Sequence, residues 1–580
     1  MSKILCRSHY KAVTPEETIN NIKNILSATL NLTTVERCQQ DSNYYFHSSR
    51  VSFPELPHSV GTNGKGMTYQ YSLASAYGEL MERMQNNILF PMQPFTTPFF
   101  RKYIEQFIPS FSRFLIRNNM EQNYTYAPDE KNSIEIHDYH MDNISDVLGA
   151  SDIYLPFYSI KDAAAVYLPI TKIRAQCTSN GMCAGNTPQE AILQGICEII
   201  ERFAIKQFFK EKIIPATIDK ELFKGTTIYE YILNLEKINN WRLEIKDCSC
   251  GIGLPAIGLL IIDRNTSRYH FHVGSDPSPI TALERTLTEL FQGRTTLPFK
   301  DFDPIYQDRL YNNLDLSMSE SQKTYHDNTG VFPYSVLCSS KVQNYSLEDN
   351  DMSDKENLKK IIKLISDLGY NIYIRDVSFL GFPAFHIYIP GMSEIYSTNN
   401  IITKSDSLKA LLLSIDPNKL SNENYDFLHS YLSIKDSING LQILGNEIMS
   451  DYDIAYAYFS IAIGKYSSAF EYLNHWINNN AECNIKYKCM RDVIYYDYIN
   501  RTSDSSHIYK LYDKELILKV KSSLRLRTID DLIKYSCKLN CEKCSNINEC
   551  STLMQFRIVK RIETIYEQNI IDQTIVREYL

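Results

Sequence analysis

The sequence predicts an α/β domain over about residues 1–400 and an all-helical domain over residues 401–580. Two observations lead to this division. In the first part, apolar stretches rich in β-branched residues, at 256–262, 269–273 and 384–389, alternate with long stretches of helical period. From about residue 405 these strand signals fade, and Leu, Ile, Tyr, Lys and Glu recur at helical spacing. A Pro-Gly pair at 390–391 marks a break close to the expected boundary.

The composition excludes several classes of protein. The chain has 580 residues, a formal net charge of −8, 44% hydrophobic residues and 22% charged residues. These values are ordinary for a globular protein and exclude disorder, collagen and a coiled coil. At roughly 100–200 residues per domain, the length suits two to four domains. The mild acidity argues against a dedicated nucleic-acid binder or a binder of anionic membranes.

Membrane insertion and secretion are also not expected. The longest strongly apolar run, at 252–262, is interrupted by Gly and Pro and is far shorter than the roughly 20 residues of a spanning helix. The first residues turn polar at once, without the apolar stretch of a signal peptide. The 14 cysteines are scattered along the chain. We therefore expect a cytoplasmic protein with reduced thiols.

A local pattern occurs three times in the first 300 residues. Each copy has a glycine-containing loop followed by a helix that carries two Glu or Gln residues three positions apart. The copies span 62–83, 179–202 and 274–294. From the loop glycine to the first acidic residue there are 15, 17 and 15 positions. The paired residues are Glu79/Glu82, Glu198/Glu201 and Glu289/Gln292.

This pattern predicts a metal–phosphate site. A spacing of three places both side chains on one face of a helix, and these faces are otherwise apolar. Carboxylates there should point toward a core or cleft, where charge is costly unless it is paired or metal-bound. Hard oxygen ligands suit magnesium, which in turn suits nucleotide phosphates. Arg83, Arg202 and Arg294 close the three helices and could bind phosphate through their guanidinium groups.

A solvated helix face is the alternative interpretation of this pattern. A single E-x-x-E-R string usually forms a solvated face with local ion pairs, but three copies at nearly the same spacing favour a shared site. Standard nucleotide signatures are missing. The segment GTNGKGMT at 61–68 lacks the order of a Walker loop, and no G-x-G-x-x-G opens a βαβ unit. No nucleophile elbow is present either.

At these residues the sequence resembles the YcaO family of ATP-dependent enzymes that activate backbone amides of peptides. The resemblance rests on SNGMCAGNTPQEA…EIIER, TNGKG…GELMER, ALERTLTELFQGR and IPGMSEIY. The resemblance runs from about Lys11 to Tyr396. Within the family, the sequence is similar to the stand-alone bacterial type.

The resemblance implies a cleft in the α/β domain that binds ATP with magnesium. At the positions of the magnesium ligands, this chain has Glu79, Glu82, Glu198 and Glu201. At the positions that contact ATP, it has Lys11, Thr18, Cys183, Asn186, Glu190, Arg202 and Gln292. Cys183 replaces the serine of the stand-alone proteins, which puts a hydroxyl role there in doubt. No catalytic residue is assigned, because the family's chemistry needs no protein nucleophile.

The implied reaction is attack of a nucleophile on a backbone amide whose oxygen is phosphorylated by ATP. The product is an azoline if the nucleophile is a neighbouring Cys, Ser or Thr, and a thioamide if it is external sulfide. Azoline-forming members end in a proline-rich tail, whereas this chain ends in TIVREYL, and no peptide-recognition domain precedes Lys11. Both features favour the stand-alone type, an accessory factor in methylthiolation of a small-subunit ribosomal protein.

Three functional hypotheses therefore stand. The first is activation of backbone amides by a stand-alone protein that assists ribosomal protein methylthiolation, with a methylthiotransferase as partner. The second is a thioamide- or azoline-forming maturase that acts on a ribosomally made precursor peptide. The third is a non-catalytic nucleotide-binding scaffold.

The helical tail contains a segment typical of a tetratricopeptide hairpin. A turn glycine and small residues are placed suitably within 456–473, but three copies at a fixed period are not found. An irregular helical bundle fits the tail equally well. Either form could bind a protein partner or form a homodimer.

Four cysteines lie close together near the end of the chain, in CKLNCEKCSNINEC at 537–550. They suit zinc or an iron–sulfur cluster, although the two separated C-x₂-C pairs of a zinc site are absent. Reduced thiols in a helix–loop segment are the alternative. The four residues are Cys537, Cys541, Cys544 and Cys550.

Overall fold

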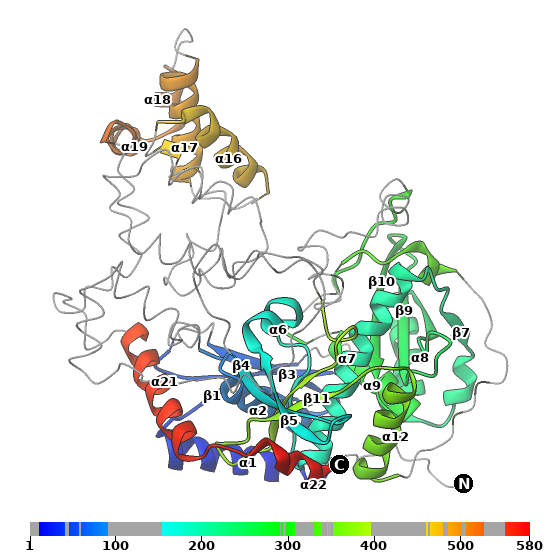
Figure 1. The fold of residues 1–580 in the computed structure, drawn as a ribbon. Coiled ribbons are helices and arrows are strands. Elements are labelled where there is room, and N and C mark those ends of the chain that lie inside the picture. The colour runs from blue at the N-terminus through cyan, green and yellow to red at the C-terminus, as the bar shows by residue number, and fades with distance from the viewer. Residues whose placement is uncertain are drawn as a thin grey trace.

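A computed structural model shows the fold of the chain (Figure 1). It describes residues 11–40, 46–90 without 57–59, 154–304 without 291 and 294–296, 330–338, 352–395, 464–479, 485–500, 506–526 and 551–580, with a few single residues between them. These residues form a mixed α/β part followed by helices, as the sequence predicts. None of the described helices is both long and apolar enough to cross a bilayer.

Three antiparallel sheets form the β structure. The first has the order β1 (Val35–Gln40), β2 (His47–Ser52), β3 (Gly61–Gly66). The second has the order β10 (Arg268–Ser275), β9 (Ala256–Asp263), β8 (Trp241–Asp247), β7 (Ala216–Ile218). The third has the order β5 (Ala164–Pro169), β4 (Tyr154–Ser159), β11 (Tyr373–Asp376), β12 (Ala384–Tyr388), β6 (Met182–Ala184). The strands predicted at 256–262, 269–273 and 384–389 are thus confirmed as β9, β10 and β12.

Three helices follow an outer strand of each sheet directly. They are α2 (Tyr69–Gln85) after β3, α7 (Pro188–Lys210) after β6, and α9 (Pro279–Glu289) after β10. Each begins after a hydroxyl residue, Thr68, Thr187 or Ser278, whose side chain accepts a hydrogen bond from the N–H three residues later. The three acidic segments therefore share one strand–cap–helix arrangement.

Two details of the predicted pattern are corrected. The glycines at 61–66 and 274 lie in strands rather than loops, because a strand without side chains can approach the helix backbone closely. At Gly64, for example, a Cβ would lie 2.0 Å from the carbonyl oxygen of Ser72 in α2. The third helix also ends at Glu289, so Gln292 lies beyond it rather than on its face.

The central helix, α7, is buried on nearly all sides. It packs against β9 and β10 on one sheet, against β6 and β12 on another, and against α12 (Asp354–Asp367). Two further apolar cores lie on either side: α1 (Pro15–Ile25) with α2, and α8 (Thr227–Asn239) with α9. Figure 1 shows α7 between these groups. The shorter elements are η1 (Leu26–Leu30), α6 (Ile170–Cys177), η4 (Lys220–Phe223) and η6 (Tyr334–Leu337).

The C-terminal region is helical where it is described. Its first helices are α16 (Tyr466–Asn479), α17 (Ile485–Ile494), η9 (Tyr495–Ile499), α18 (Ile508–Leu511) and α19 (Lys514–Leu526). The helices α21 (Ser551–Gln568), η12 (Gln573–Ile575) and α22 (Val576–Tyr579) pack on the α/β part instead. The predicted boundary near residue 400 lies outside the described residues, so it and the tetratricopeptide likeness stay predictions.

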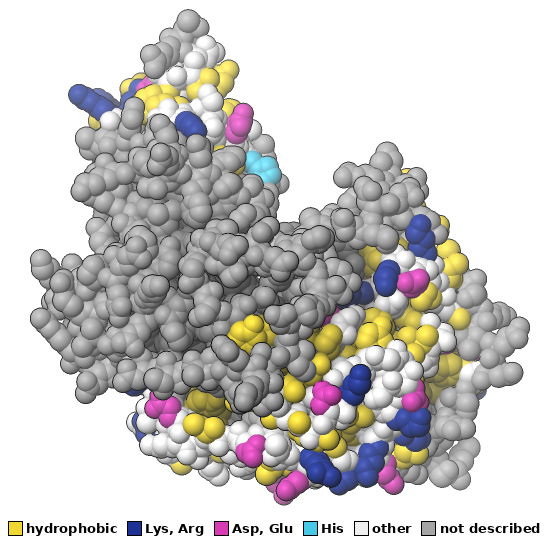
Figure 2. All heavy atoms as spheres, in the orientation of Figure 1, with side chains coloured by type: hydrophobic (Ala, Val, Ile, Leu, Met, Phe, Trp, Pro, Cys, Tyr) yellow, Lys and Arg dark blue, Asp and Glu magenta, His cyan; other side chains and the backbone are white. Residues whose placement is uncertain are grey.

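Charges on the visible surface are mixed. On the face drawn in Figure 2, Lys and Arg side chains of the described residues are interspersed with Asp and Glu. This mixture fits the small net charge of −8.

Candidate functional site

The three helices α2, α7 and α9 line a common cavity of about 420 Å³. Strand β3 and the residues just before α1 complete its wall. The structure thus brings together segments that are more than 200 residues apart in the sequence. Ten of the predicted site residues line this cavity: Lys11, Thr18, Glu79, Glu82, Asn186, Glu190, Glu198, Glu201, Arg202 and Gln292.

The other predicted residues lie elsewhere or are not described. Cys183 is buried in β6, where its thiol lies 3.7 Å from the carbonyl oxygen of Phe385, and it is not among the lining residues. Its contact with ATP stays a prediction. Arg294 and the cysteines Cys537, Cys541, Cys544 and Cys550 lie outside the described residues.

The carboxylates of α2 and α7 are paired with arginines of their own helices. Arg83 contacts Glu79 and Glu82 at 3.4 Å each, and Arg202 contacts Glu198 at 3.1 Å. A spacing of four residues places such partners side by side on a helix. Burial nevertheless raises the pKa of Glu79 and raises the pKa of Glu82 well above its ordinary value. This end of the cavity therefore lacks enough positive charge to stabilise all its carboxylates.

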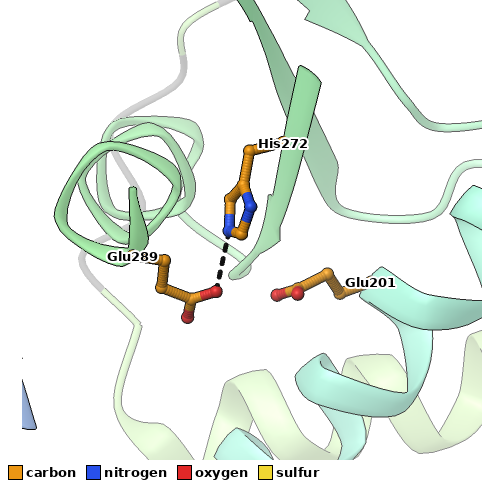
Figure 3. Close-up of side chains that lie close together, drawn as sticks. All are labelled: Glu201, His272 and Glu289. Atoms are coloured by element: carbon orange, nitrogen blue, oxygen red, sulfur yellow. Dashed lines mark hydrogen bonds and ion pairs between the residues drawn. The ribbon is translucent and has the colours of Figure 1, made fainter. Parts of the chain in front are cut away.

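The third helix supplies its carboxylate in a different way. Glu289 is the last residue of α9, and its partners are Lys65 from β3 and His272 from β10, whose Nε2 lies 2.8 Å from Oε2 of Glu289. Glu201 of α7 completes this group. Figure 3 shows Glu201, His272 and Glu289 pointing toward one another. One ligand atom from each of these three lies within 4.8 Å of the others, so the group could hold a metal ion.

The two glutamates in this group have opposite pKa shifts. Burial and the neighbouring Glu289 raise the pKa of Glu201 to about 8. Burial also raises the pKa of Glu289, but Lys65 and His272 lower it more, and the result lies well below the ordinary value. A cation that contacted both carboxylates would favour the charged form of each.

The opposite end of the cavity has a connected hydrogen-bond network. Glu190 accepts hydrogen bonds from the Lys11 ammonium and the Ala12 N–H, each at 3.1 Å, and from the Asn186 amide at 3.3 Å. Thr18 donates to the amide oxygen of Asn186 at 2.8 Å. Burial raises the pKa of Glu190, but Lys11 and these donors lower it below the ordinary value. The N-terminal segment with Lys11 and Thr18 and the segment with Asn186 and Glu190 at the start of α7 therefore form one polar wall of the cavity.

Gln292 joins the acidic end although it lies beyond its helix. Its amide donates to the carbonyl oxygen of Asn63 at 2.7 Å and to Glu79 at 3.4 Å. Gly293, with φ at +67°, follows directly. A positive φ of this kind typically ends a helix.

The lining residues carry more acidic than basic groups. Seven carboxylates line the cavity, against five Lys or Arg side chains. Clustered carboxylate oxygens are the ligands that magnesium prefers, so the residues present fit a divalent cation together with phosphate groups. Sequence reasoning missed Lys65 and His272; it placed Glu289 in the three-helix pattern but did not name it among the magnesium ligands. Alternation along β3 was the available signal for Lys65, because it places Lys65 opposite the glycines that contact α2. His272 lies on the same face of β10 as Gly274, where a Cβ would meet α9.

Comparison with known proteins identifies the class to which this fold and cavity belong. The family described as YcaO cyclodehydratase, ATP- and Mg²⁺-binding, matches residues 63–393, which is more than half of the chain. The chain belongs to the YcaO family.

Two curated relatives are similar over most of that region. One is an uncharacterized protein of Haemophilus influenzae, 28% identical over 60% of this chain and 60% of its own length. The other is the ribosomal protein S12 methylthiotransferase accessory factor YcaO of Escherichia coli, 27% identical over 63% of each chain. The matches thus span less than two thirds of either relative.

Two solved structures are also similar. One is a heterocyclase in complex with substrate and cofactor, at 18% identity and a TM-score of 0.43, covering 67% of this chain and 53% of that one. The other is YcaO from Methanopyrus kandleri bound with AMPPCP and Mg²⁺, at 15% identity and a TM-score of 0.42, covering 66% and 92%.

Proposed function

We propose that this chain binds ATP with magnesium in the cavity and uses it to phosphorylate the oxygen of a backbone amide in a peptide or protein. One observation carries the proposal. Carboxylates of three helices, each of which follows a strand of a different sheet, meet in one cavity, and the polar wall around Glu190 lies in the same cavity. Membership in a family described as ATP- and Mg²⁺-binding supports it.

We assign the magnesium ions to the acidic end of the cavity. Glu79 and Glu82 of α2 face it together with Glu198 and Glu201 of α7. The buried carboxylates need positive charge beyond that of Arg83 and Arg202, and magnesium would supply it.

We assign the nucleotide to the polar wall, where Lys11, Thr18, Asn186 and Glu190 offer donors and acceptors, with Arg202 and Gln292 nearer the phosphates. ATP, when bound, supplies the phosphoryl group. The chain's own task is then to position the reactants and neutralise charge.

The substrate and the partner are also part of the proposal. The Escherichia coli relative is named as an accessory factor of a ribosomal protein S12 methylthiotransferase, which favours a small-subunit ribosomal protein as substrate and a methylthiotransferase as partner. The family description as cyclodehydratase favours the second candidate, an azoline- or thioamide-forming maturase of a precursor peptide. The helical C-terminal region is the candidate surface for a protein partner or a homodimer.

Calorimetry tests the nucleotide site. Native protein is titrated with a non-hydrolysable ATP analogue in magnesium, beside a Glu198→Gln/Glu201→Gln variant. We expect the affinity for the nucleotide to fall by more than about 100-fold in the variant. Substituting even a residue that only hydrogen-bonds to a metal ligand typically lowers metal affinity by about 10–100-fold. A Glu211→Gln/Glu230→Gln variant, which changes two exposed carboxylates outside the cavity, should bind like the native chain. Circular dichroism checks that each variant is folded.

The outcomes separate the candidates. A folded native chain that binds no nucleotide contradicts the proposal. Binding without hydrolysis, whichever peptide or partner is added, supports a non-catalytic scaffold. Hydrolysis that a ribosomal protein stimulates favours the accessory-factor role, and stimulation by a precursor peptide favours the maturase.

A further inference from the structure

Lys65 reaches the cavity because of the sequence of strand β3. In GTNGKG at 61–66, burial alternates along the strand, so that Thr62, Gly64 and Gly66 are buried and the residues between them are not. The two glycines lie against the backbone of α2, where a Cβ would come within 2.0 and 2.6 Å of Ser72. Lys65 therefore points the other way, into the cavity, where it contacts Glu289.

The surroundings of Lys65 are those of a bound cation. Its charge lowers the pKa of Glu79, Glu201 and Glu289, which come from three different helices. Glu201 and Glu289 are also two of the three residues that could hold a metal ion, with His272 as the third. An ammonium at Glu289 and a divalent cation among these three residues would compete for the same carboxylate oxygens.

Lys65 differs from the other cations of the acidic end. Arg83 and Arg202 are fixed beside carboxylates of their own helices. Since α9 ends at Glu289, its last carboxylate has no arginine one turn further on; Arg285, one turn earlier, adds positive charge nearby, but the ammonium in contact with Glu289 comes from another sheet. A lysine side chain is a point charge on a flexible four-carbon stem, so it can change partners more easily than a guanidinium held in a fork.

We propose that Lys65 is an exchangeable counter-ion: a divalent cation bound by Glu201, His272 and Glu289 displaces its ammonium, which then binds the phosphate groups of the nucleotide. This inference rests on the proposed function, because the second half of the exchange requires a nucleotide in the cavity. The exchange keeps Glu289 paired when the cavity is empty and adds a phosphate contact only when metal is present.

The exchange predicts opposite effects of one substitution on two ligands. In a Lys65→Met variant, Mn²⁺ binding without nucleotide, followed by electron paramagnetic resonance, should become about tenfold tighter because the competing charge is gone. Binding of an ATP analogue with magnesium, followed by calorimetry, should become about tenfold weaker because a phosphate contact is lost. A Lys65→Arg variant keeps the charge and should not gain Mn²⁺ affinity.

A second variant tests where the ion binds. Adding Glu289→Gln to Lys65→Met should abolish the gain in Mn²⁺ affinity. If circular dichroism shows that Lys65→Met is unfolded, the Glu289→Gln variant is measured in its place. It should bind Mn²⁺ more weakly without nucleotide, because one ligand is lost. Unchanged Mn²⁺ affinity overturns the exchange.

The remaining outcomes are decisive as well. If Lys65→Met weakens both ligands, or changes neither, Lys65 is a structural ion-pair partner and the exchange is wrong. If the native chain binds no nucleotide, the proposed function fails and the phosphate half of the exchange fails with it. The Mn²⁺ comparison without nucleotide still decides the first half, so the two failures can be told apart.

Discussion

Glu190 and Glu284 line the same cavity but have opposite electrostatic surroundings. Glu190 contacts Lys11 and accepts a backbone N–H, and the sum of these contacts lowers its pKa. Burial and the nearby Asp276 raise the pKa of Glu284 to about 7. One carboxylate is therefore charged at neutral pH, whereas the other is divided between its charged and neutral forms.

Glu284 should make stability depend on pH. Because its folded pKa is raised above the ordinary 4.5, the folded state holds the proton more tightly, and stability is lost as pH rises from about 4.5 through 7. Glu284→Gln should therefore stabilise the protein by about 1–3 kcal/mol at pH 8 and by little at pH 5. Urea unfolding at both values, with a chelator present, measures the difference. Glu230→Gln, at an exposed position, is the control, and an equal gain at both pH values would contradict the assignment.

At the scale of elements, the contact between β3 and α2 depends on glycine. A Cβ on Gly64 would lie 2.0 Å from the Ser72 carbonyl oxygen and 2.2 Å from the Ala76 nitrogen, whereas one on Gly78 of α2 would meet nothing within 4 Å. Gly64→Ala should thus cost more than about 2 kcal/mol, since backbone atoms must move. Gly78→Ala should add about 0.5–1 kcal/mol, as an alanine inside a helix does. Thermal unfolding compares the two; a Gly64→Ala variant as stable as the native chain would show that β3 does not lie so close.

The sequence was sufficient to predict the helices and their acidic faces but not how each one ends. In all three copies the first residue of the acidic pair lies 11 positions after the helix cap, which is Thr68, Thr187 or Ser278. This spacing is more regular than the one measured from the glycine. The early end of α9 was harder to predict, because LTELF continues the helical pattern. Gly293, the nearest stop signal in the sequence, would have placed the end near residue 292 rather than at Glu289.

The missed residues of the site depend on contacts that no local pattern contains. Lys65 and His272 lie on outer strands of two different sheets, and their common partner Glu289 lies 224 residues from Lys65 in sequence. Periodicity shows which way a side chain points but not which other sheet it will meet. The resemblance to a family could place the residues it names, and these two were not among them.

At the scale of the whole molecule, the last residues of the chain hold the α/β part together. Val576 is buried in the same core as α7, and Ile558, Val559 and Ile562 of α21 are buried in the core of α1 and α2. The sequence assigned 551–580 to the helical region because amphipathic helices look alike wherever they dock. Figure 1 shows α21 and α22 lying along the side of the molecule where α1 lies.

Gln573 makes this arrangement testable. Its side chain accepts a hydrogen bond from the Asp376 N–H at 2.7 Å and donates to the Asp376 carbonyl oxygen at 3.1 Å, as a neighbouring strand would. Six residues further on, the tail reaches the first turn of α7, where Gln189 donates to the Tyr579 carbonyl oxygen at 3.0 Å. Gln573→Ala would leave buried backbone groups unpaired and should cost about 2–4 kcal/mol.

Hydrogen exchange would show how far the loss of Gln573 spreads. If the tail is part of the α/β core, amides at the start of α7 should lose protection together with those of β11, and nucleotide affinity should fall because Glu190 lies in that first turn. Glu578→Gln, a change at an exposed position of α22, should leave both unchanged. Loss of protection confined to residues 569–580 would mean instead that the tail only rests on a core that is stable without it. The shape of the cavity would then not depend on the tail.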